Sequence, residues 1–189
     1  STQYLVSGFL GTKNYMKPGQ VYDFTKAGHD VAAHTFDHRD LTRLSDKDLE
    51  MQLDLPKTGL SKCYGEVTDF AAPYGNFDIR TTTQTKARYE TSRSTTVGFN
   101  TADLFNPYEL KVQNVRKDTT PTEIQAWLDT AKQTKTWLIL VYHQVDDSDG
   151  EFARKPADFE NDIKAIVASG VSVKTVHDAY AGIKPQLKQ

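Results

Sequence analysis

The sequence predicts a parallel α/β domain in which strands alternate with covering helices. The chain has 189 residues, the length of one domain, 1–189, with a substantial core. Segments with strand and helix patterns alternate for six or seven rounds, as in βαβ units. No glycine-rich dinucleotide or phosphate loop follows any strand, which favours a (β/α) barrel over an open doubly wound sheet.

The first half of the chain is expected to alternate three times between strand and helix. Pro18 suits the first turn of a helix that Gly28 ends. Ser45, with Asp48 three residues later, starts a second helix, which Pro56 is expected to break or kink. The expected elements are a strand at 4–9, a helix at 18–27, a buried strand at 31–33, the Ser45 helix, a strand at 69–72 and a helix from Asn76 to Arg88.

The second half is expected to continue the alternation after a loop at 98–110 that carries aromatic residues. Residues 110–115 alternate between apolar and polar, whereas 137–142 is a fully apolar strand. Thr120, Pro121 and Glu123 mark the start of a helix. The remaining expected elements are a strand at 91–94, a helix at 157–169 with Phe159, Ile163, Ile166 and Val167 facing inward, a strand at 171–174 and a last helix through Ile183.

Composition excludes several classes of partner. The formal net charge is −2 and the charges are interspersed, which argues against a nucleic-acid or membrane-surface protein. The longest apolar run, 137–142, is too short for a membrane span. The single cysteine, Cys63, excludes an intrachain disulfide.

Polar residues with catalytic chemistry follow three of the expected strands. His34 ends the 31–33 strand and His38 follows four residues later, a spacing at which two imidazoles can reach one zinc, cobalt or nickel ion. Tyr74 follows the 69–72 strand and His143 follows the 137–142 strand. Because the carboxyl ends of parallel strands form the active-site edge, these residues predict a metal-assisted site. The alternative is that these histidines only form hydrogen bonds. We expect structural roles for His29, beside a glycine before a strand, and for His177, near the start of the last helix, where solvent exposure is usual.

These residues carry a resemblance to a known family. His34-Thr35-Phe36-Asp37-His38 resembles the H-[ST]-x-x-H metal motif of the NodB-homology polysaccharide deacetylases, the fourth carbohydrate esterase family. Phe70 to Gly75 resembles the R-x-P-Y motif of that family, and Val141-Tyr142-His143 resembles its L-x-H motif. The three motifs occur in the family's order. The resemblance implies an irregular (β/α) barrel with seven or fewer strands.

The resemblance also implies a role for each matching residue. His34 and His38 would be two of three protein ligands to a divalent metal, usually zinc, with cobalt or nickel possible. The backbone N–H of Tyr74 would stabilise an oxyanion, and His143 would be the general acid. The substrate would be a polysaccharide or oligosaccharide, either an N-acetylglucosamine-type glycan or an acetylated xylan, and the location extracellular or in the cell envelope.

Two features depart from the family pattern. No T-F-D-D motif, which supplies the catalytic base and the third ligand, precedes His34, so we expect a barrel incomplete at its N-terminus. Exposed strand edges in such a barrel would favour self-association. Ala71 stands where the family has an arginine, and Arg93 on a neighbouring strand is a candidate replacement. Asp37, Asp146 and Asp147 are candidates to complete the site.

Three functions are therefore compatible with the sequence. The first is a metal-dependent deacetylase. The second is a non-catalytic carbohydrate-binding remnant of the same fold, whose loop aromatics stack on sugars. The third is a structural α/β domain. The aromatic residues considered for stacking are Tyr15, Phe99, Phe105 and Tyr108.

Overall fold

The computed structural model of the chain describes residues 1–187 and divides into two compact units. The first unit contains residues 1–94, 107–110 and those from 173 on, and the second contains residues 95–106 and 111–172. Strands β4 and β5 each contribute residues to both units. The units are described separately below.

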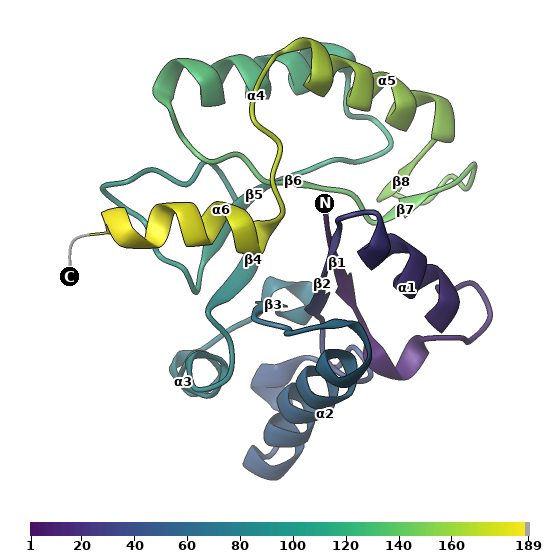
Figure 1. The fold of residues 1–189 in the computed structure, drawn as a ribbon, viewed down its shortest axis with the longest axis vertical. Helices are drawn as coiled ribbons and strands as arrows, with labels where there is room; N and C mark the ends of the chain where they lie inside the picture. The colour runs from purple at the N-terminus through teal and green to yellow at the C-terminus, as the bar shows by residue number, and fades with distance from the viewer. Residues whose placement is uncertain (188–189) are drawn as a thin grey trace. The chain divides into compact units, whose positions relative to one another are not determined.

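The first unit is built on parallel strands with helices packed against them (Figure 1). In the ladder between β1 and β2, Leu5 pairs with Ala33, and Ala33 in turn pairs with Phe70 of β3. The strands are β1 (Thr2–Leu5), β2 (Asp30–Ala33), β3 (Asp69–Ala71) and β4 (Thr91–Val97), and the helices are α1 (Pro18–Lys26), α2 (Asp46–Tyr64), α3 (Ile79–Lys86) and α6 (Val176–Ile183). Short 3-10 turns lie at Ser7–Phe9, Leu41–Arg43, Pro73–Gly75 and Lys184–Gln186.

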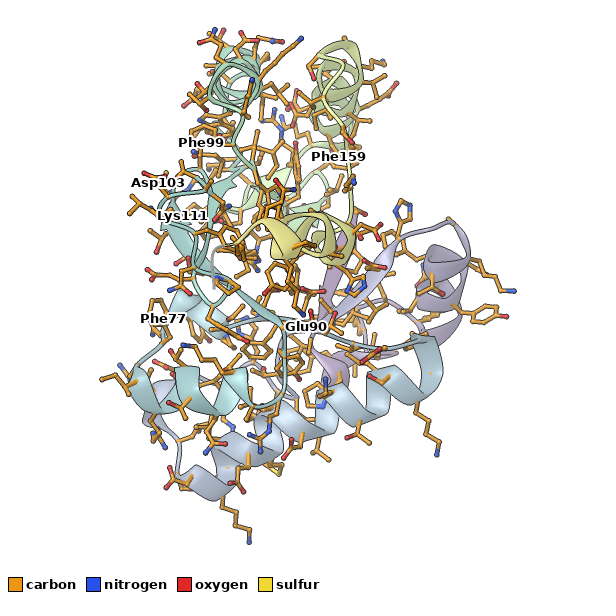
Figure 2. All side chains as sticks on the ribbon, turned by 60° about the vertical axis from the view of Figure 1, so that its left-hand side comes forward. Phe77, Glu90, Phe99, Asp103, Lys111 and Phe159 are labelled. Atoms are coloured by element: carbon orange, nitrogen blue, oxygen red, sulfur yellow. The ribbon has the colours of Figure 1, made fainter. Side chains whose placement is uncertain are left out.

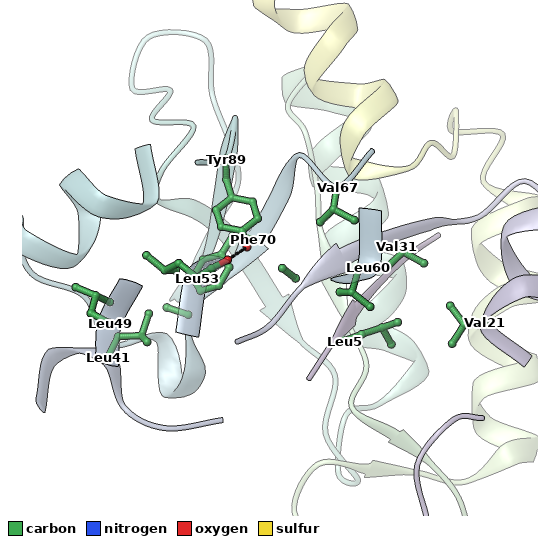
Figure 3. Packing of buried hydrophobic residues seen from close by; sticks show 12 residues of the cluster. Leu5, Val21, Val31, Leu41, Leu49, Leu53, Leu60, Val67, Phe70 and Tyr89 are labelled. Atoms are coloured by element: carbon green, nitrogen blue, oxygen red, sulfur yellow. Dashed lines mark hydrogen bonds between the residues drawn. The ribbon is translucent and has the colours of Figure 1, made fainter. Parts of the chain in front are cut away.

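One face of this sheet packs against α1 and α2 to form the hydrophobic core (Figure 3). Phe70 is fully buried, and its ring stacks on Tyr89 with centroids 5.0 Å apart. The Tyr89 hydroxyl donates to the Leu53 carbonyl at 2.7 Å, which satisfies its polar end inside the core. Burying a side chain the size of Phe70 contributes roughly 1.5–3 kcal/mol. This core fixes β2 and β3, the strands that lead into the candidate site.

The second unit contains the remaining strands and two helices that pack against each other. Strands β5 and β6 are parallel, with Asn114 opposite Val141, and β7 pairs with β8. The Lys111 side chain, labelled in Figure 2, lies on β5. The elements are β5 (Leu110–Asn114), α4 (Pro121–Thr134), β6 (Leu140–Val141), β7 (Gln144–Val145), β8 (Ala153–Arg154) and α5 (Pro156–Ala168).

The predicted fold class is confirmed. Six strands pair in the order β1-β2-β3-β4-β5-β6, which is the order of the chain and the order expected for successive βα units. This parallel α/β arrangement agrees with the barrel type that the sequence predicted. Over residues 1–187, no helix has both the length and the apolar character needed to cross a bilayer.

Several predicted elements differ from those observed. Strand β1 begins and ends earlier than predicted, and residues 7–9 form a 3-10 turn. Helix α2 continues through Pro56 instead of breaking there. Only Leu140–Val141 of the predicted 137–142 strand is a strand, and 171–174 is not one. Asp78, not Asn76, caps α3.

Helix α5 also differs from its prediction, because its apolar residues do not all face inward. Val167 is 72% exposed and Ile163 is 41% exposed, whereas Asp162 is buried. The reason is a buried ion pair between Asp162 and Arg154, whose nearest atoms are 2.7 Å apart. A charged residue therefore occupies the inner face that the apolar pattern had assigned to Ile163 and Val167.

Candidate functional site

His34 is the first residue after β2 and is held by the neighbouring strand. Its backbone N–H donates to the Leu5 carbonyl at 2.9 Å, which extends the β1–β2 ladder by one residue. Side chains alternate along a strand, so His34 lies on the face opposite Val31 and Ala33, which pack in the core. The sequence therefore places this imidazole on the sheet face opposite the core that α1 and α2 cover.

The loop from Thr35 to His38 has an unusual backbone that brings the second histidine back towards the first. Thr35 has a φ of 67° and His38 a φ of 64°, values that cost free energy in residues other than glycine. The His38 N–H donates to the Thr35 hydroxyl at 2.9 Å. Thr35 is fully buried, so the surrounding structure can hold this conformation.

Two segments from elsewhere in the first unit fix this loop. The Oε1 atom of buried Gln52 accepts hydrogen bonds from the N–H groups of Phe36 at 3.0 Å and Asp37 at 3.2 Å. On the other side, the Gly8 N–H donates to the Phe36 carbonyl at 2.8 Å. The loop between the two histidines is therefore anchored by α2 and by the turn that follows β1.

The rings of His34 and His38 lie side by side at the end of β2. Their ring centroids are 4.8 Å apart and the rings are nearly perpendicular, at 82°. The Nδ1 atom of His34 lies 2.7 Å from the Ala71 carbonyl oxygen, which can only accept, so Nδ1 carries the proton and the neutral ring keeps its lone pair on Nε2. Burial lowers the pKa of His38 and favours the neutral form that a metal ligand requires.

Tyr74 lies beside this pair, in the turn that follows β3. Its φ is 61°, and its ring centroid is 5.0 Å from that of His38. The Asn76 side chain donates to Asp40 at 2.9 Å and ties this turn to the segment that follows His38. The structure thus brings His34, His38 and Tyr74 together, while the oxyanion role of the Tyr74 N–H stays a prediction.

The pair of histidines does not form part of a larger ligand group. Within residues 1–187, no three histidine, cysteine, aspartate or glutamate side chains are placed to hold one metal ion. The Asp37 carboxylate, a predicted candidate, instead pairs with Arg39, whose Nε lies 3.0 Å from Oδ2. Catalytic zinc sites have three protein ligands. Among the described residues only the His34 and His38 rings come together, which is one ligand fewer than such a site has.

Arg93 occupies the position that the sequence suggested for a replacement arginine. It lies opposite Ala71 in the ladder between β3 and β4, and it is 6% exposed. Its guanidinium carbon is 4.9 Å from the centroid of the Tyr4 ring. Burial lowers the pKa of Arg93. A buried arginine on the same strand face as His34 can orient a carboxylate, which is the role that the missing arginine would have.

His143 follows β6 in the second unit and is exposed. Its ring centroid lies 4.8 Å from that of Phe152. The preceding residue, Tyr142, donates from its hydroxyl to Asp162 at 3.2 Å, which anchors the start of this segment. Asp146, a candidate base, accepts a hydrogen bond from the Ser148 N–H at 3.0 Å. The general-acid role of His143 stays a prediction.

The other two histidines form local contacts. His29 stacks on Phe24 with ring centroids 4.1 Å apart, and its Nδ1 lies 3.0 Å from the amino group of Ser1. The Nδ1 atom of His177 lies 2.9 Å from the Thr68 hydroxyl. These hydrogen bonds agree with the structural roles predicted for both.

The close approach of Gly8 to the histidine loop leads to a first prediction. A Cβ atom at position 8 would lie 2.5 Å from the Phe36 carbonyl oxygen, so Gly8→Ala must displace the loop. We expect a loss of about 1–3 kcal/mol in the free energy of unfolding, typical of overpacking, together with weaker zinc binding. Urea denaturation and calorimetric titration measure the two effects.

The matched control is Gly19→Ala in α1, where a Cβ atom would meet nothing within 4 Å. This change should stabilise the protein by roughly 0.5–1 kcal/mol and leave zinc binding unchanged. Equal stability and zinc affinity in Gly8→Ala and the parent protein would contradict the assigned role of Gly8.

Gln52 and Gly8, which hold the loop, are not among the residues predicted for the site, although each has a signal in the sequence. Gln52 is a polar residue on the buried stripe of α2, beside Leu49 and Leu53. Such a residue usually has a hydrogen-bonding task inside the protein. Gly8 interrupts the apolar segment that was predicted as a strand, and an isolated glycine there often marks a close backbone approach.

The first half of the chain matches a known protein family. Residues 1–91 match the protein family described as polysaccharide deacetylase. No curated protein sequence matches the chain. A polysaccharide deacetylase of Bacillus cereus is 25% identical, with a TM-score of 0.49, over 51% of this chain and 31% of its own. The match thus spans about a third of the length of that relative.

Two further solved structures share the fold over most of the chain. The Xyl-CE4 domain of a multidomain xylanase from the hindgut metagenome of Trinervitermes trinervoides has a TM-score of 0.64 and 14% identity, covering 96% of this chain and 77% of its own. A CE4 family pseudoenzyme from Bacillus anthracis has a TM-score of 0.54 and 15% identity, covering 85% of this chain and 50% of its own.

Proposed function

Because residues 1–91 match the polysaccharide deacetylase family and the chain shares the fold of a solved CE4 domain, we propose that this protein removes acetyl groups from a polysaccharide by metal-dependent hydrolysis. The observation that carries the proposal is the pair of His34 and His38. Their rings are 4.8 Å apart, and the Ala71 carbonyl holds the tautomer of His34 that presents Nε2. Fixing the tautomer in this way is typical of histidine ligands.

In this proposal His34 and His38 bind a divalent ion, zinc first and cobalt or nickel as alternatives. When bound, such an ion would supply Lewis-acid chemistry to an acetyl carbonyl and to the attacking water. The Tyr74 N–H donates a hydrogen bond to the oxygen that becomes negative, and His143 gives a proton to the departing amine or hydroxyl. Arg93 would orient a carboxylate that accepts a proton from the attacking water, and Asp37, Asp146 and Asp147 are the candidates for that carboxylate.

The rate is expected to be low, because the described residues supply only two histidine ligands and no carboxylate beside them. Each missing ligand weakens metal binding, and a missing general base lowers the rate by about 10²–10⁴. The substrate class in the proposal is an N-acetylglucosamine-type glycan or an acetylated xylan, outside the cell or in its envelope. Self-association through the edge of β1, the first strand in the order, is part of the same proposal.

A second candidate function is a non-catalytic carbohydrate-binding protein. The observation that favours it is again the two-ligand site, because a polysaccharide deacetylase fold without a complete metal site can keep its sugar-binding surface. The pseudoenzyme from Bacillus anthracis has the same fold. Acetate release separates the two functions, since both allow glycan binding.

The test measures acetate released from chito-oligosaccharides and acetylated xylan, with added zinc and with EDTA. We expect slow release that requires zinc and disappears in the His34→Ala, His38→Ala double variant. Calorimetric titration should show zinc binding to the parent protein and no zinc binding to the double variant.

The matched control is His29→Ala, which removes a histidine that contacts Phe24 and Ser1 and lies outside the pair. It should keep both zinc binding and acetate release. Release that EDTA does not change, or identical zinc isotherms for the parent and double variant, would contradict the proposal. Glycan binding without any acetate release would favour the non-catalytic function.

A further inference from the structure

The second unit contains a cavity that the proposed deacetylase chemistry does not use. It has a volume of about 290 Å³ and lies where β5 ends and α4 begins. Small-molecule sites start at about 300 Å³, so this open pocket has room for a small ring rather than for a large ligand. The side chains that line it include Gln113, Asn114, Arg116, Asp118, Glu123 and Trp127.

Two amide side chains of the lining form no hydrogen bond with any residue from 1 to 187. Gln113 is only 6% exposed, yet within the described chain its side-chain amide forms no hydrogen bond. The same holds for the Asn114 amide among residues 1–187. Because these amides line a pocket that is open to solvent, their donors and acceptors are available to the hydroxyl groups of a bound ligand.

Two charged residues of the lining interact with neighbouring groups of the protein. Arg116 pairs with Glu151 at 2.7 Å, and Glu123 accepts a hydrogen bond from the Thr120 backbone N–H at 2.7 Å. Asp118 adds a further negative charge to the lining. With its cation neutralised and carboxylates present, the cavity disfavours phosphate and other anions.

The polar and aromatic side chains of the lining are suited to binding a sugar ring. Amides and a carboxylate offer donors and acceptors to hydroxyl groups, which both donate and accept. Trp127 lies one turn after Glu123 on α4 and adds an aromatic wall, against which the C–H groups of a pyranose can pack. A neutral pyranose therefore matches the size, polarity and charge of the cavity.

We propose that this cavity binds one pyranose residue of a neutral oligosaccharide, with Gln113 and Asn114 hydrogen-bonded to its hydroxyl groups and Trp127 against its ring. Only the choice of probes rests on the proposed function. Binding is measured with EDTA present and without any acetate assay. Failure of this site is thus distinguishable from failure of the deacetylase proposal.

The test uses tryptophan fluorescence. The chain has two tryptophans, so Trp137→Phe leaves Trp127 as the only reporter. Titration of this variant with triacetylchitotriose or with xylotriose should give a saturable change in fluorescence. Adding Asn114→Ala or Gln113→Ala should raise the Kd by about three- to tenfold, the effect of one lost neutral hydrogen bond.

The matched control is Gln125→Ala on the same helix, an exposed glutamine whose side chain bonds only Asp129, at 2.9 Å. It should leave the Kd unchanged, and circular dichroism should show that each variant is folded. Absence of a saturable change with both sugars would overturn the proposal. So would a Kd that Asn114→Ala and Gln113→Ala do not alter, or saturable binding of inorganic phosphate in place of the sugars.

Discussion

Replacement of Asp162 by alanine is expected to lower the free energy of unfolding of the second unit by about 3–5 kcal/mol. Asp162 is 2% exposed and forms two hydrogen bonds with Arg154, at 2.9 Å and 2.7 Å, besides accepting one from Tyr142. The variant would leave the Arg154 guanidinium buried without its carboxylate. Urea denaturation, followed by circular dichroism, measures the loss.

Two further variants separate the buried charge from a general effect of mutation. Glu160→Gln breaks the exposed pair with Lys164 on the same helix and should cost less than about 1 kcal/mol. The double variant Arg154→Met, Asp162→Leu removes both buried charges and should recover most of the loss. A loss in Asp162→Ala no larger than that in Glu160→Gln would contradict the prediction.

Replacement of His143 by alanine is expected to lower kcat for acetate release by about 10²–10⁴ and to leave zinc binding unchanged. In the proposed reaction the leaving amine or hydroxyl would depart without a proton donor, whereas the proposed metal ligands His34 and His38 remain. Rates with saturating zinc and chito-oligosaccharide measure the effect, and added imidazole should restore part of the lost rate.

The control for this prediction is Phe152→Leu, which removes the aromatic ring that contacts His143, 4.8 Å between centroids, and keeps the imidazole. This variant should change kcat much less than His143→Ala does, because the proton donor is still present. Equal kcat values in the parent protein and in His143→Ala would show that another group protonates the leaving group.

Much of the fold is readable from the sequence because its signals are local. Caps and helix starts at Pro18, Ser45 and Thr120 coincide with the observed starts of α1, α2 and α4. The first and last residues of a strand are harder to predict from the sequence, because a strand exists only where it pairs with a neighbouring strand. The apolar run at 137–142 pairs as β6 only at Leu140–Val141, while Trp137 forms an isolated antiparallel bridge with Asn100. Apolar character predicts burial, and pairing decides strand length.

The sequence by itself determined which residues stand at the ends of the strands, and hence that His34, His38 and Tyr74 are neighbours. Only the tertiary structure decided how they are held. The Ala71 carbonyl sets the tautomer of His34, and Gln52 binds the backbone of the histidine loop. These contacts join residues 15 or more apart in the chain, through single hydrogen bonds with directional geometry. Periodicity reports which face of an element is buried, but it carries no information about which distant atom completes a hydrogen bond.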